Sequence, residues 1–501
     1  MLIDAAYTRL ISTLRAHADL AAALHLLEWD QETYMPAGAI DGRARQIGAL
    51  AAQLHRCRTD PAFLDLVDGL AAELPRLSPE QAVDVRETKW RLDRQRALDA
   101  DLVRERSELH AQARAVWITA RETDQFTVLA PFLSRIVDVE RRVAAAIDPT
   151  RPAYDVLLEG YEPGATTADL ETIFGELRQG LLPLVDRLRG RLDTRPLEAS
   201  ALRGHFPVDA QLRFNRLVSE RLGFDFRRGR LDEAVHPFTM SIGPDVRLTT
   251  RYDEHDLSYA LYSTIHETGH GLYEQGLDPE AWGTPRGQSC SLGIHESQSR
   301  LWENQVGRSE AFWRHLLPTA AACFPALADT SLKSVLATVN AARPSLIRTE
   351  ADEITYNLHI ILRFELERTL VDRSLDVGAL PEAWRDKMRH YLGVAPCTDR
   401  EGVLQDVHWA SGAIGYFPTY ALGNIYAAQL MRAAEADLGG LDAAFAAGDF
   451  QLLLGWLRDH VHRLGQRNRP AALIAAATGQ PPSCRPLLEH LDRKLSVIEE
   501  L

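Results

Sequence analysis

Apolar residues recur at intervals of three and four along most of the chain, the spacing that lines one face of an α-helix. Residues 1–147 follow this pattern almost without interruption and are rich in Leu, Ala, Arg and Glu. Asp60 and Ser78, each followed by a proline, mark two helix starts, because both side chains cap a first turn and proline fits its first position. Further helices are expected over residues 166–225 and 255–501. The pattern therefore predicts a mainly α protein.

The helical pattern breaks over residues 236–252. In Asp245–Tyr252 (DVRLTTRY) Val246 and Leu248 alternate with polar residues, and this period of two predicts a strand. The strand comes just before a helix with candidate chemistry, so an extended peptide could pair with its edge. A plain packing hairpin is the alternative interpretation. The remaining Pro-bearing breaks predict loops, at Asp148–Pro152, Thr194–Pro207, Pro396–Arg400 and Gly479–Pro486.

Candidate chemistry is concentrated in HETGH, formed by His266, Glu267 and His270 within Ser263–Gly276. Two histidines four residues apart lie on one face of a helix, about one turn apart, so both imidazoles can bind one metal ion. Glu267 is offset from that face and can act as general base toward a water at the metal. An ordinary helix with two surface histidines is the alternative, because the pentapeptide also arises by chance. A metal-dependent hydrolase is the leading hypothesis.

The expected helix spans Tyr259–Gln275, which no proline interrupts, and Gly276 is expected to be its C-cap. Gly269 and Gly271 lie inside it, where each glycine weakens a helix by about 1 kcal/mol relative to alanine. We therefore expect these two glycines to leave room for close packing or for a substrate.

A third metal ligand is expected from Leu292–Asn304 (LGIHESQSRLWEN), which reads as a second helix. Its candidates are His295 and Glu296, and the spacing alone does not choose between them. We favour Glu296, because two histidines and one glutamate on successive helices are a known catalytic zinc set. For each, the alternative is a hydrogen bond to a ligand or a salt bridge to Arg300. Glu303 could orient a ligand imidazole.

HETGH followed by HESQSRLWEN is similar to the Taq-type zinc metallocarboxypeptidases, a family of the gluzincin group. Several further motifs in the same order extend this resemblance over most of the chain, and together they are far more specific than HETGH alone. They are LEWDQETYMP at Leu27–Pro36, HPF at His236–Phe238, DVRLT at Asp245–Thr249, IRTEADEITY at Ile347–Tyr356 and GVLQDVHW at Gly402–Trp409.

The resemblance implies a large helical peptidase fold, neurolysin-like in shape, with a deep groove between two helical walls and a small β-sheet beside the zinc helix. It implies one domain over residues 1–501, in which about 1–230 form groove wall and about 231–501 carry the zinc motifs. It implies release of single C-terminal residues from peptides, with broad specificity. One Zn²⁺ per chain and a homodimer are expected, with Co²⁺ or Mn²⁺ as possible substitutes for zinc.

By motif match, His266, His270 and Glu296 are the expected metal ligands, and Glu267 is the general acid/base. An exopeptidase must also recognise the terminal carboxylate, and the planar fork of arginine binds carboxylates in a bidentate manner. From the resemblance we favour Arg348 for this role.

The competing candidate for the carboxylate is Arg247, in the strand pair Arg247–Asp245. Arg348 itself is expected on a helix over Arg343–Leu370, whose polar stripe faces the groove. The stripe consists of Arg348, Asp352, Tyr356, His359 and Arg363.

The transition-state oxyanion needs hydrogen-bond donors, and His408, Tyr416 and Tyr420 are the candidates. Gly412, Gly415 and Gly423 permit tight turns that can present aromatic side chains. The segment resembles the His…Gly-rich…Tyr element of neurolysin-like peptidases, which implies the donor roles for His408 and Tyr420. Tyr416 and His236 are grouped with the substrate-binding residues.

Composition and charge limit the kinds of partner and the cellular location that we expect. The net charge of −14, from 56 basic and 70 acidic residues, disfavours nucleic acid as a partner. Five scattered cysteines do not form a disulfide framework. The N-terminus reads as an amphipathic helix rather than a signal peptide, and no apolar run reaches the 18 residues of a membrane span. A cytoplasmic location is expected.

Two rival functions remain from the sequence. One is an oligoendopeptidase or dipeptidyl carboxypeptidase on the same scaffold, which differs in where the terminal carboxylate is anchored. The other is a non-catalytic metal-binding protein. Glu267 argues against the second, because a purely structural site needs no general base and is usually closed by four protein ligands.

Overall fold

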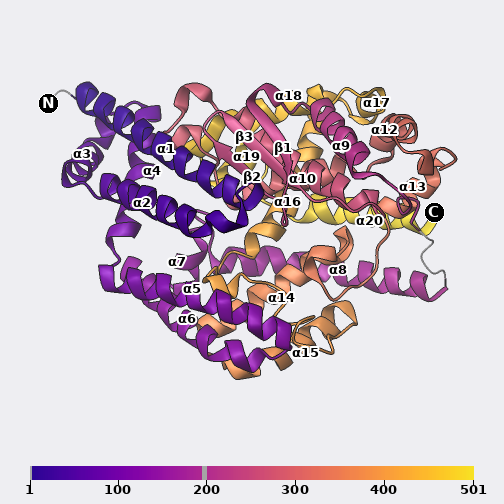
Figure 1. The fold of residues 1–501 in the computed structure, drawn as a ribbon, viewed down its shortest axis with the longest axis horizontal. Helices are drawn as coiled ribbons and strands as arrows, with labels where there is room; N and C mark the ends of the chain where they lie inside the picture. Colours follow the sequence, from indigo (N-terminus) through magenta and orange to yellow (C-terminus); the bar gives the residue numbers. More distant parts are fainter. Residues whose placement is uncertain (1–2, 195–199, 501) are drawn as a thin grey trace.

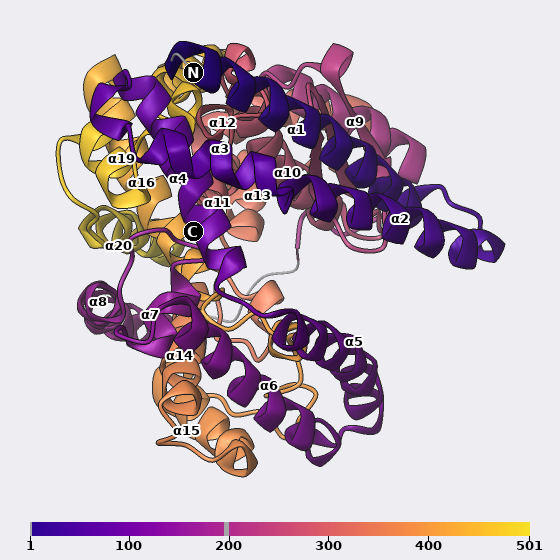
Figure 2. The ribbon, with the colours of Figure 1, turned by 90° about the vertical axis from the view of Figure 1, so that its left-hand side faces the viewer.

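The computed structural model describes residues 3–194 and 200–500, and these form two helical walls that face each other (Figures 1 and 2). The upper wall in Figure 2 holds the N-terminal helices, the sheet and much of the second half of the chain. Its helices are α1 (Ile3–Thr33), α2 (Ile40–Arg58), α3 (Pro61–Ala71), α4 (Pro79–Arg96), α9 (Val208–Leu222), α10 (Leu257–Gly276), α11 (Leu292–Arg300), α12 (Glu310–Cys323), α13 (Leu332–Val339), α17 (Asp442–Ala447), α18 (Gln451–His460) and α19 (Pro470–Thr478).

The lower wall is built from helices of two separate stretches of the chain. They are α5 (Ala100–Thr123), α6 (Phe126–Ile147), α7 (Ala153–Leu158), α8 (Thr167–Thr194), α14 (Glu353–Val371) and α15 (Leu380–Leu392). Two long helices, α16 (Pro418–Leu438) and α20 (Arg485–Glu500), join the walls, because α16 packs on both α11 and α14 while α20 packs on α8 and α16. The expectation of a mainly α fold with two walls is confirmed.

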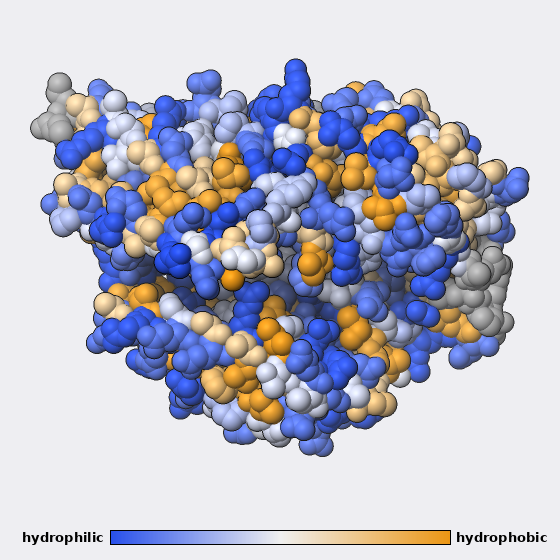
Figure 3. Space-filling view, viewed as in Figure 1, coloured by the Kyte–Doolittle hydropathy of each residue, from blue (hydrophilic) through white to orange (hydrophobic). Residues whose placement is uncertain are grey.

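A hollow crosses the surface between the two walls (Figure 3). A cavity of about 1450 Å³ lies there, lined by residues of α10, α13, α14, α16 and α20. Among the described residues, no helix has the length and apolar composition needed to cross a membrane.

The first helices carry the caps that the sequence predicts. The Asp60 carboxylate accepts hydrogen bonds from the first backbone N–H groups of α3. Ser78 and Gln81 form a reciprocal capping box at the start of α4. The helices α1, α3 and α4 then share a small core, around Leu10, Phe63 and Val67, that is separate from the main core of the molecule.

The small sheet contains β1 (Gly229–Glu233), β2 (Thr239–Ile242) and β3 (Asp245–Thr250) in the order β1-β3-β2. The predicted strand is therefore the central one, parallel to β1 and antiparallel to β2. The expectation that its edge is open to a peptide is wrong, because both of its edges are already paired. The two edges of the sheet belong to β1 and β2, and β2 contacts α10 and α1.

The glycines of α10 serve close packing. A Cβ at Gly269 would lie 2.6 Å from the Gln298 carbonyl oxygen of α11, and one at Gly271 would lie 2.7 Å from the Phe224 ring. Gly276 is the last residue of the helix rather than its C-cap, and a side chain there would collide with the ring of His462. These glycines are therefore explained by the close packing of α10 against its neighbours, and not by space for a substrate.

The helix expected over Arg343–Leu370 is shorter than predicted. It begins at Glu353, and the Asp352 side chain caps it by accepting from the N–H groups of Ile354 and Thr355. Pro344 lies within the range where a helix was expected, and a proline there removes a backbone donor. Arg348 instead lies in a short 3₁₀ turn.

The second predicted helix begins at Leu292 as expected, but the last part of the predicted range is not α-helical. After α11 the chain continues as a π-helical turn over Leu301–Val306. Such turns are rare and frequently lie at functional sites.

Candidate metal centre and active site

Three side chains from two helices converge beside the cavity. His266 and His270 come from α10, and Glu296 comes from α11. One possible ligand atom from each lies within 4.8 Å of the others. The Glu296 Oε2 atom is 3.7 Å from the Nε2 atom of His266 and 3.5 Å from that of His270. The structure therefore brings together the three residues expected to bind metal.

The second oxygen of Glu296 and the second nitrogen of His266 are held by neighbours. Arg300 donates from Nε to Glu296 Oε1 at 2.8 Å, and it also bonds Glu303 Oε2 at 3.2 Å. Glu303, in the π-helical turn, bonds His266 Nδ1 at 2.9 Å. His295 lies behind His270, with the two Nδ1 atoms 2.6 Å apart. Glu296, and not His295, is thus in the cluster of three.

The electrostatics of the cluster suit a cation. Burial alone would raise the pKa of Glu296, but Arg300 and the two histidines outweigh it and hold that pKa well below its ordinary value. Burial lowers the pKa of His270 to about 3, so its imidazole is neutral and keeps a lone pair. Two imidazoles and one carboxylate are the donor set of catalytic zinc sites, so these residues fit a divalent metal ion.

Glu267 is almost fully buried next to this cluster, with 6% of its surface exposed. Its Oε2 atom accepts a hydrogen bond of 2.7 Å from the hydroxyl of Thr239, on β2. Burial raises the pKa of Glu267 above its ordinary value, against the opposing effect of His266. A carboxylate with a raised pKa is a better proton acceptor near neutral pH, as a general base requires.

A cluster of aromatic side chains lies at the start of α16. His408 Nε2 is 3.2 Å from the hydroxyl of Tyr420, and the ring of Tyr416 lies 5.3 Å from that of His408. Burial raises the pKa of both tyrosines, and the charge of Glu296 contributes to each shift. Burial also lowers the pKa of His408 to about 4. The three expected oxyanion donors are therefore neutral hydrogen-bonding groups close to the metal cluster.

A buried carboxylate holds the turn on which this cluster rests. Glu367 of α14 accepts hydrogen bonds from the Tyr154 hydroxyl at 2.7 Å, from Trp409 Nε1 at 2.8 Å and from the Gly415 backbone at 3.1 Å. Trp409 directly follows His408, and Gly415 directly precedes Tyr416. Burial raises the pKa of Glu367 to about 7.

Arg348 lies behind these aromatic rings and is only 6% exposed. Its Nε and Nη2 atoms donate to Asp406 Oδ1 at 3.0 and 2.8 Å, and Nη1 donates to the Tyr356 hydroxyl at 3.1 Å. Arg363 binds the other oxygen of Asp406. Asp406 thus ties both arginines to the segment that carries His408.

The polar stripe of α14 does not face the groove along its whole length. Tyr356 lines the cavity, but His359 and Arg363 are fully buried. The expectation of one continuous groove-facing line is therefore wrong. The stripe turns inward, because Arg363 pairs with Asp406 in the segment before His408.

The other two substrate-binding candidates lie elsewhere. Arg247, on β3, donates twice to its neighbour Asp245, and its guanidinium lies 4.1 Å from the centre of the Trp29 ring. It therefore joins α1 to the sheet. His236 is exposed in the connection between β1 and β2, and no hydrogen bond or ion pair joins its side chain to other described residues.

The site can now be compared with known proteins. A family model described as carboxypeptidase Taq (M32) metallopeptidase matches residues 9–495. The chain belongs to this carboxypeptidase Taq (M32) family. It is 46% identical to thermostable carboxypeptidase 1 of Thermus thermophilus, over 99% of both chains, and 36% identical to carboxypeptidase 1 of Bacillus subtilis, over 96% of both. The crystal structure of the M32 carboxypeptidase from Deinococcus radiodurans R1 superposes with a TM-score of 0.96 at 40% identity, covering 99% of this chain and 100% of that one.

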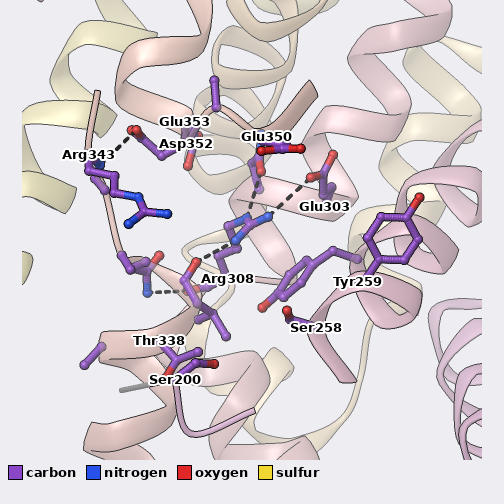
Figure 4. A pocket seen from close by; sticks show the side chains of 18 of the residues that line it. Ser200, Ser258, Tyr259, Glu303, Arg308, Thr338, Arg343, Glu350, Asp352 and Glu353 are labelled. Atoms are coloured by element: carbon purple, nitrogen blue, oxygen red, sulfur yellow. Dashed lines mark hydrogen bonds and ion pairs between the residues drawn. The ribbon is translucent and has the colours of Figure 1, made fainter. Parts of the chain in front are cut away.

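Membership of the carboxypeptidase Taq family makes this protein a metallocarboxypeptidase, which hydrolyses peptides with a metal cofactor. The cavity between the walls has His266 among its lining residues. In Figure 4, Arg308 is joined to Glu303 near its centre, with Asp352 and Glu353 on one side and Ser258 and Tyr259 on the other. The cavity is thus bounded by both α10 and the start of α14.

Sequence reasoning missed three groups that contact the residues of this candidate site. Thr239 directly follows the HPF motif, and its place beside Glu267 depends on the pairing of β2 with β3. Asp406 belongs to the GVLQDVHW motif, but the motif does not predict its pairing with Arg348 and Arg363 from other segments. Gly423 lies inside α16 rather than in the tight turn expected there, and it packs against Glu296.

Proposed function

We propose that this metallocarboxypeptidase uses one Zn²⁺, held by His266, His270 and Glu296, to release single C-terminal amino acids from peptides with broad specificity. The observation that carries the proposal is the convergence of these three side chains within 4.8 Å, with the buried Glu267 beside them. A divalent zinc ion in such a site supplies a Lewis acid that activates water and polarises the scissile carbonyl. Co²⁺ or Mn²⁺ could occupy the same ligands.

Glu267 is the general acid/base of this proposal. Its carboxylate removes a proton from the attacking water and then gives it to the leaving amine. The hydrogen bond from Thr239 fixes the Oε2 atom and leaves Oε1 for the proton. The raised pKa of Glu267 supports both halves of this task, since the group must hold a proton between them.

His408 and Tyr420 donate hydrogen bonds to the oxyanion that develops on the carbonyl. Their side chains are 3.2 Å apart and nearly buried, so donors placed there lose little to reorganisation in water. Tyr416 packs against both rings and is proposed to bind substrate beside them.

Arg348 holds the terminal carboxylate of the peptide in this proposal. Two arginines, Arg348 and Arg363, share the single carboxylate of Asp406, which leaves one positive charge uncompensated in a buried place. An arginine has five N–H donors, and Arg348 uses three of them on Asp406 and Tyr356. A substrate carboxylate would supply the missing negative charge. Arg247 remains the competing candidate for this role, and His236 a candidate for substrate binding, on their motif matches alone.

The test is a mass-spectrometric time course on a peptide of about ten residues, run beside the same peptide with an amidated C-terminus. We expect a ladder that loses one C-terminal residue at a time, is absent for the amide and stops on adding a chelator. Internal cleavage of both peptides would instead indicate an endopeptidase, and loss of residue pairs a dipeptidyl carboxypeptidase. Glu267→Gln should bind metal like the wild type but show no turnover; near-normal activity of this variant refutes the mechanism.

We further propose, from the family likeness, that the protein is a homodimer of the cytoplasm. Light scattering coupled to gel filtration tests the first point, with a mass of twice 55.9 kDa expected. A mass of one chain at micromolar concentration would contradict it.

A further inference from the structure

The two histidines of the metal cluster are supported in different ways. His266 bonds a carboxylate directly, through Glu303. His270 instead bonds another histidine, His295, whose Nδ1 atom lies 2.6 Å from His270 Nδ1. The Nε2 atom of His295 lies 2.8 Å from Glu274 Oε1. Each of the two histidines is therefore linked to a carboxylate. Glu303 bonds His266 directly, whereas the imidazole of His295 lies between Glu274 and His270.

The helices explain why this chain forms. His270 and Glu274 are four residues apart on α10, so their side chains share one face. His295 enters from α11, which approaches α10 closely because Gly269 has no side chain. The His295 ring then fills the space between the two groups, with ring centres 4.6 Å apart for His270 and His295.

The requirements of metal binding fix the proton on each atom of the chain. His270 Nε2 faces Glu296, so this nitrogen must offer its lone pair to the metal. The proton of His270 then lies on Nδ1 and is donated to His295 Nδ1. His295 in turn carries its proton on Nε2 and donates it to Glu274. Each N–H donor of this chain of hydrogen bonds therefore points toward Glu274. Among the described residues, no Lys or Arg forms an ion pair with the Glu274 carboxylate.

We propose that His295 and Glu274 are positioning residues, which hold His270 in the tautomer and ring orientation that bind the metal. This inference rests on the proposed metal site. Neither residue belongs to the group of three expected ligands. Their contribution is to metal affinity, because a ligand ring that is already oriented and correctly protonated has less freedom to lose on binding.

The experiment measures Zn²⁺ and Co²⁺ affinity by competition with a chelator for the wild type, Glu274→Gln, Glu274→Leu and His295→Phe. The exposed Glu280→Gln serves as the matched control. Loss of such supporting groups typically weakens metal binding about 10–100-fold. We expect that range for Glu274→Leu and His295→Phe, and a smaller loss for Glu274→Gln, whose amide oxygen still accepts from His295. The Co²⁺ visible spectrum should change in the same order.

A second measurement separates positioning from general support of the fold. The metal-free variants should unfold within about 2 °C of the metal-free wild type. A loss of about 1 kcal/mol lowers the unfolding midpoint of a 150–250-residue protein by about 2–4 °C, and the same loss lowers that of a longer chain by less. Affinities within twofold of the wild type would overturn the inference. So would a drop in metal-free stability that parallels the loss of affinity. If the wild type takes up no stoichiometric metal, the proposed function fails together with this inference.

Discussion

Gly423 is a position where one added methyl group should disturb the proposed metal centre directly. It lies in α16, and an added Cβ would stand 2.5 Å from Cγ and 2.7 Å from Cβ of Glu296. Carbon atoms in ordinary contact are about 3.5–4.0 Å apart, so Gly423→Ala requires a displacement of about 1 Å. The atoms in the way belong to the side chain of a proposed ligand. The substitution should therefore move Glu296 away from His266 and His270.

The magnitude follows from these distances. Forcing one extra carbon into a packed core costs about 1–3 kcal/mol of folding free energy. A displacement of about 1 Å at a reacting group can reduce the rate about 100-fold. We expect Gly423→Ala to lower kcat/KM by about that factor, to weaken metal binding at least about tenfold, and to lower the free energy of unfolding by about 1–3 kcal/mol.

The matched control is Gly455→Ala in α18, where a Cβ meets nothing within 4 Å. Alanine is favoured over glycine in a helix by about 1 kcal/mol, so this variant should be slightly more stable and fully active. Metal content, urea unfolding and peptide hydrolysis should be measured on both proteins. Wild-type metal affinity together with unchanged or increased stability in Gly423→Ala would refute the packing argument.

Three further predictions use other parts of the structure. The pKa of Glu367 is raised by burial to about 7, so the folded state holds its proton more tightly than the unfolded state does. Its contribution to stability is therefore full at low pH and is lost as pH rises toward 7. Between pH 5.5 and 8.5 the unfolding free energy of the wild type should fall by about 2 kcal/mol relative to that of Glu367→Gln. A difference in unfolding free energy between the two proteins that does not vary with pH would contradict this. Arg348→Met should erase the preference for a free C-terminal carboxylate over its amide. Equal losses on both peptides would mean that Arg348 only supports the His408 segment through Asp406. Ser78→Ala should cost about 1 kcal/mol in urea unfolding, because the capping box of α4 is lost, and no change in the midpoint would argue against it.

Local patterns were sufficient for much of the fold. The caps at Asp60 and Ser78, the HETGH helix and the start of the helix at Leu292 were all readable, because each depends on residues within one or two turns. The family resemblance added the two walls and the metallocarboxypeptidase class. The structure brings Glu296 into the cluster with His266 and His270, as the sequence-based choice of ligand expected.

What could not be read from the sequence depends on contacts between distant segments. The central place of β3 follows from its pairing with both β1 and β2. The inward turn of the α14 stripe follows from the ion pairs of Asp406 with Arg348 and Arg363, between residues 43 and 58 positions apart. Pro344 was a local signal against a long helix and was overlooked.

The π-helical turn at Leu301–Val306 makes the length of this segment important for the candidate metal centre. Deleting one residue there would let the chain relax into an ordinary α-helix. Because a π-turn holds one residue more than an α-turn, the flanking segments would keep nearly their present orientation, but one of the six side chains that the turn now presents would be lost from its position. Glu303, which lies in this turn, would then be displaced from its position between His266 and Arg308. Insertions and deletions should therefore be tolerated in the surface loops of related chains but absent from these six residues.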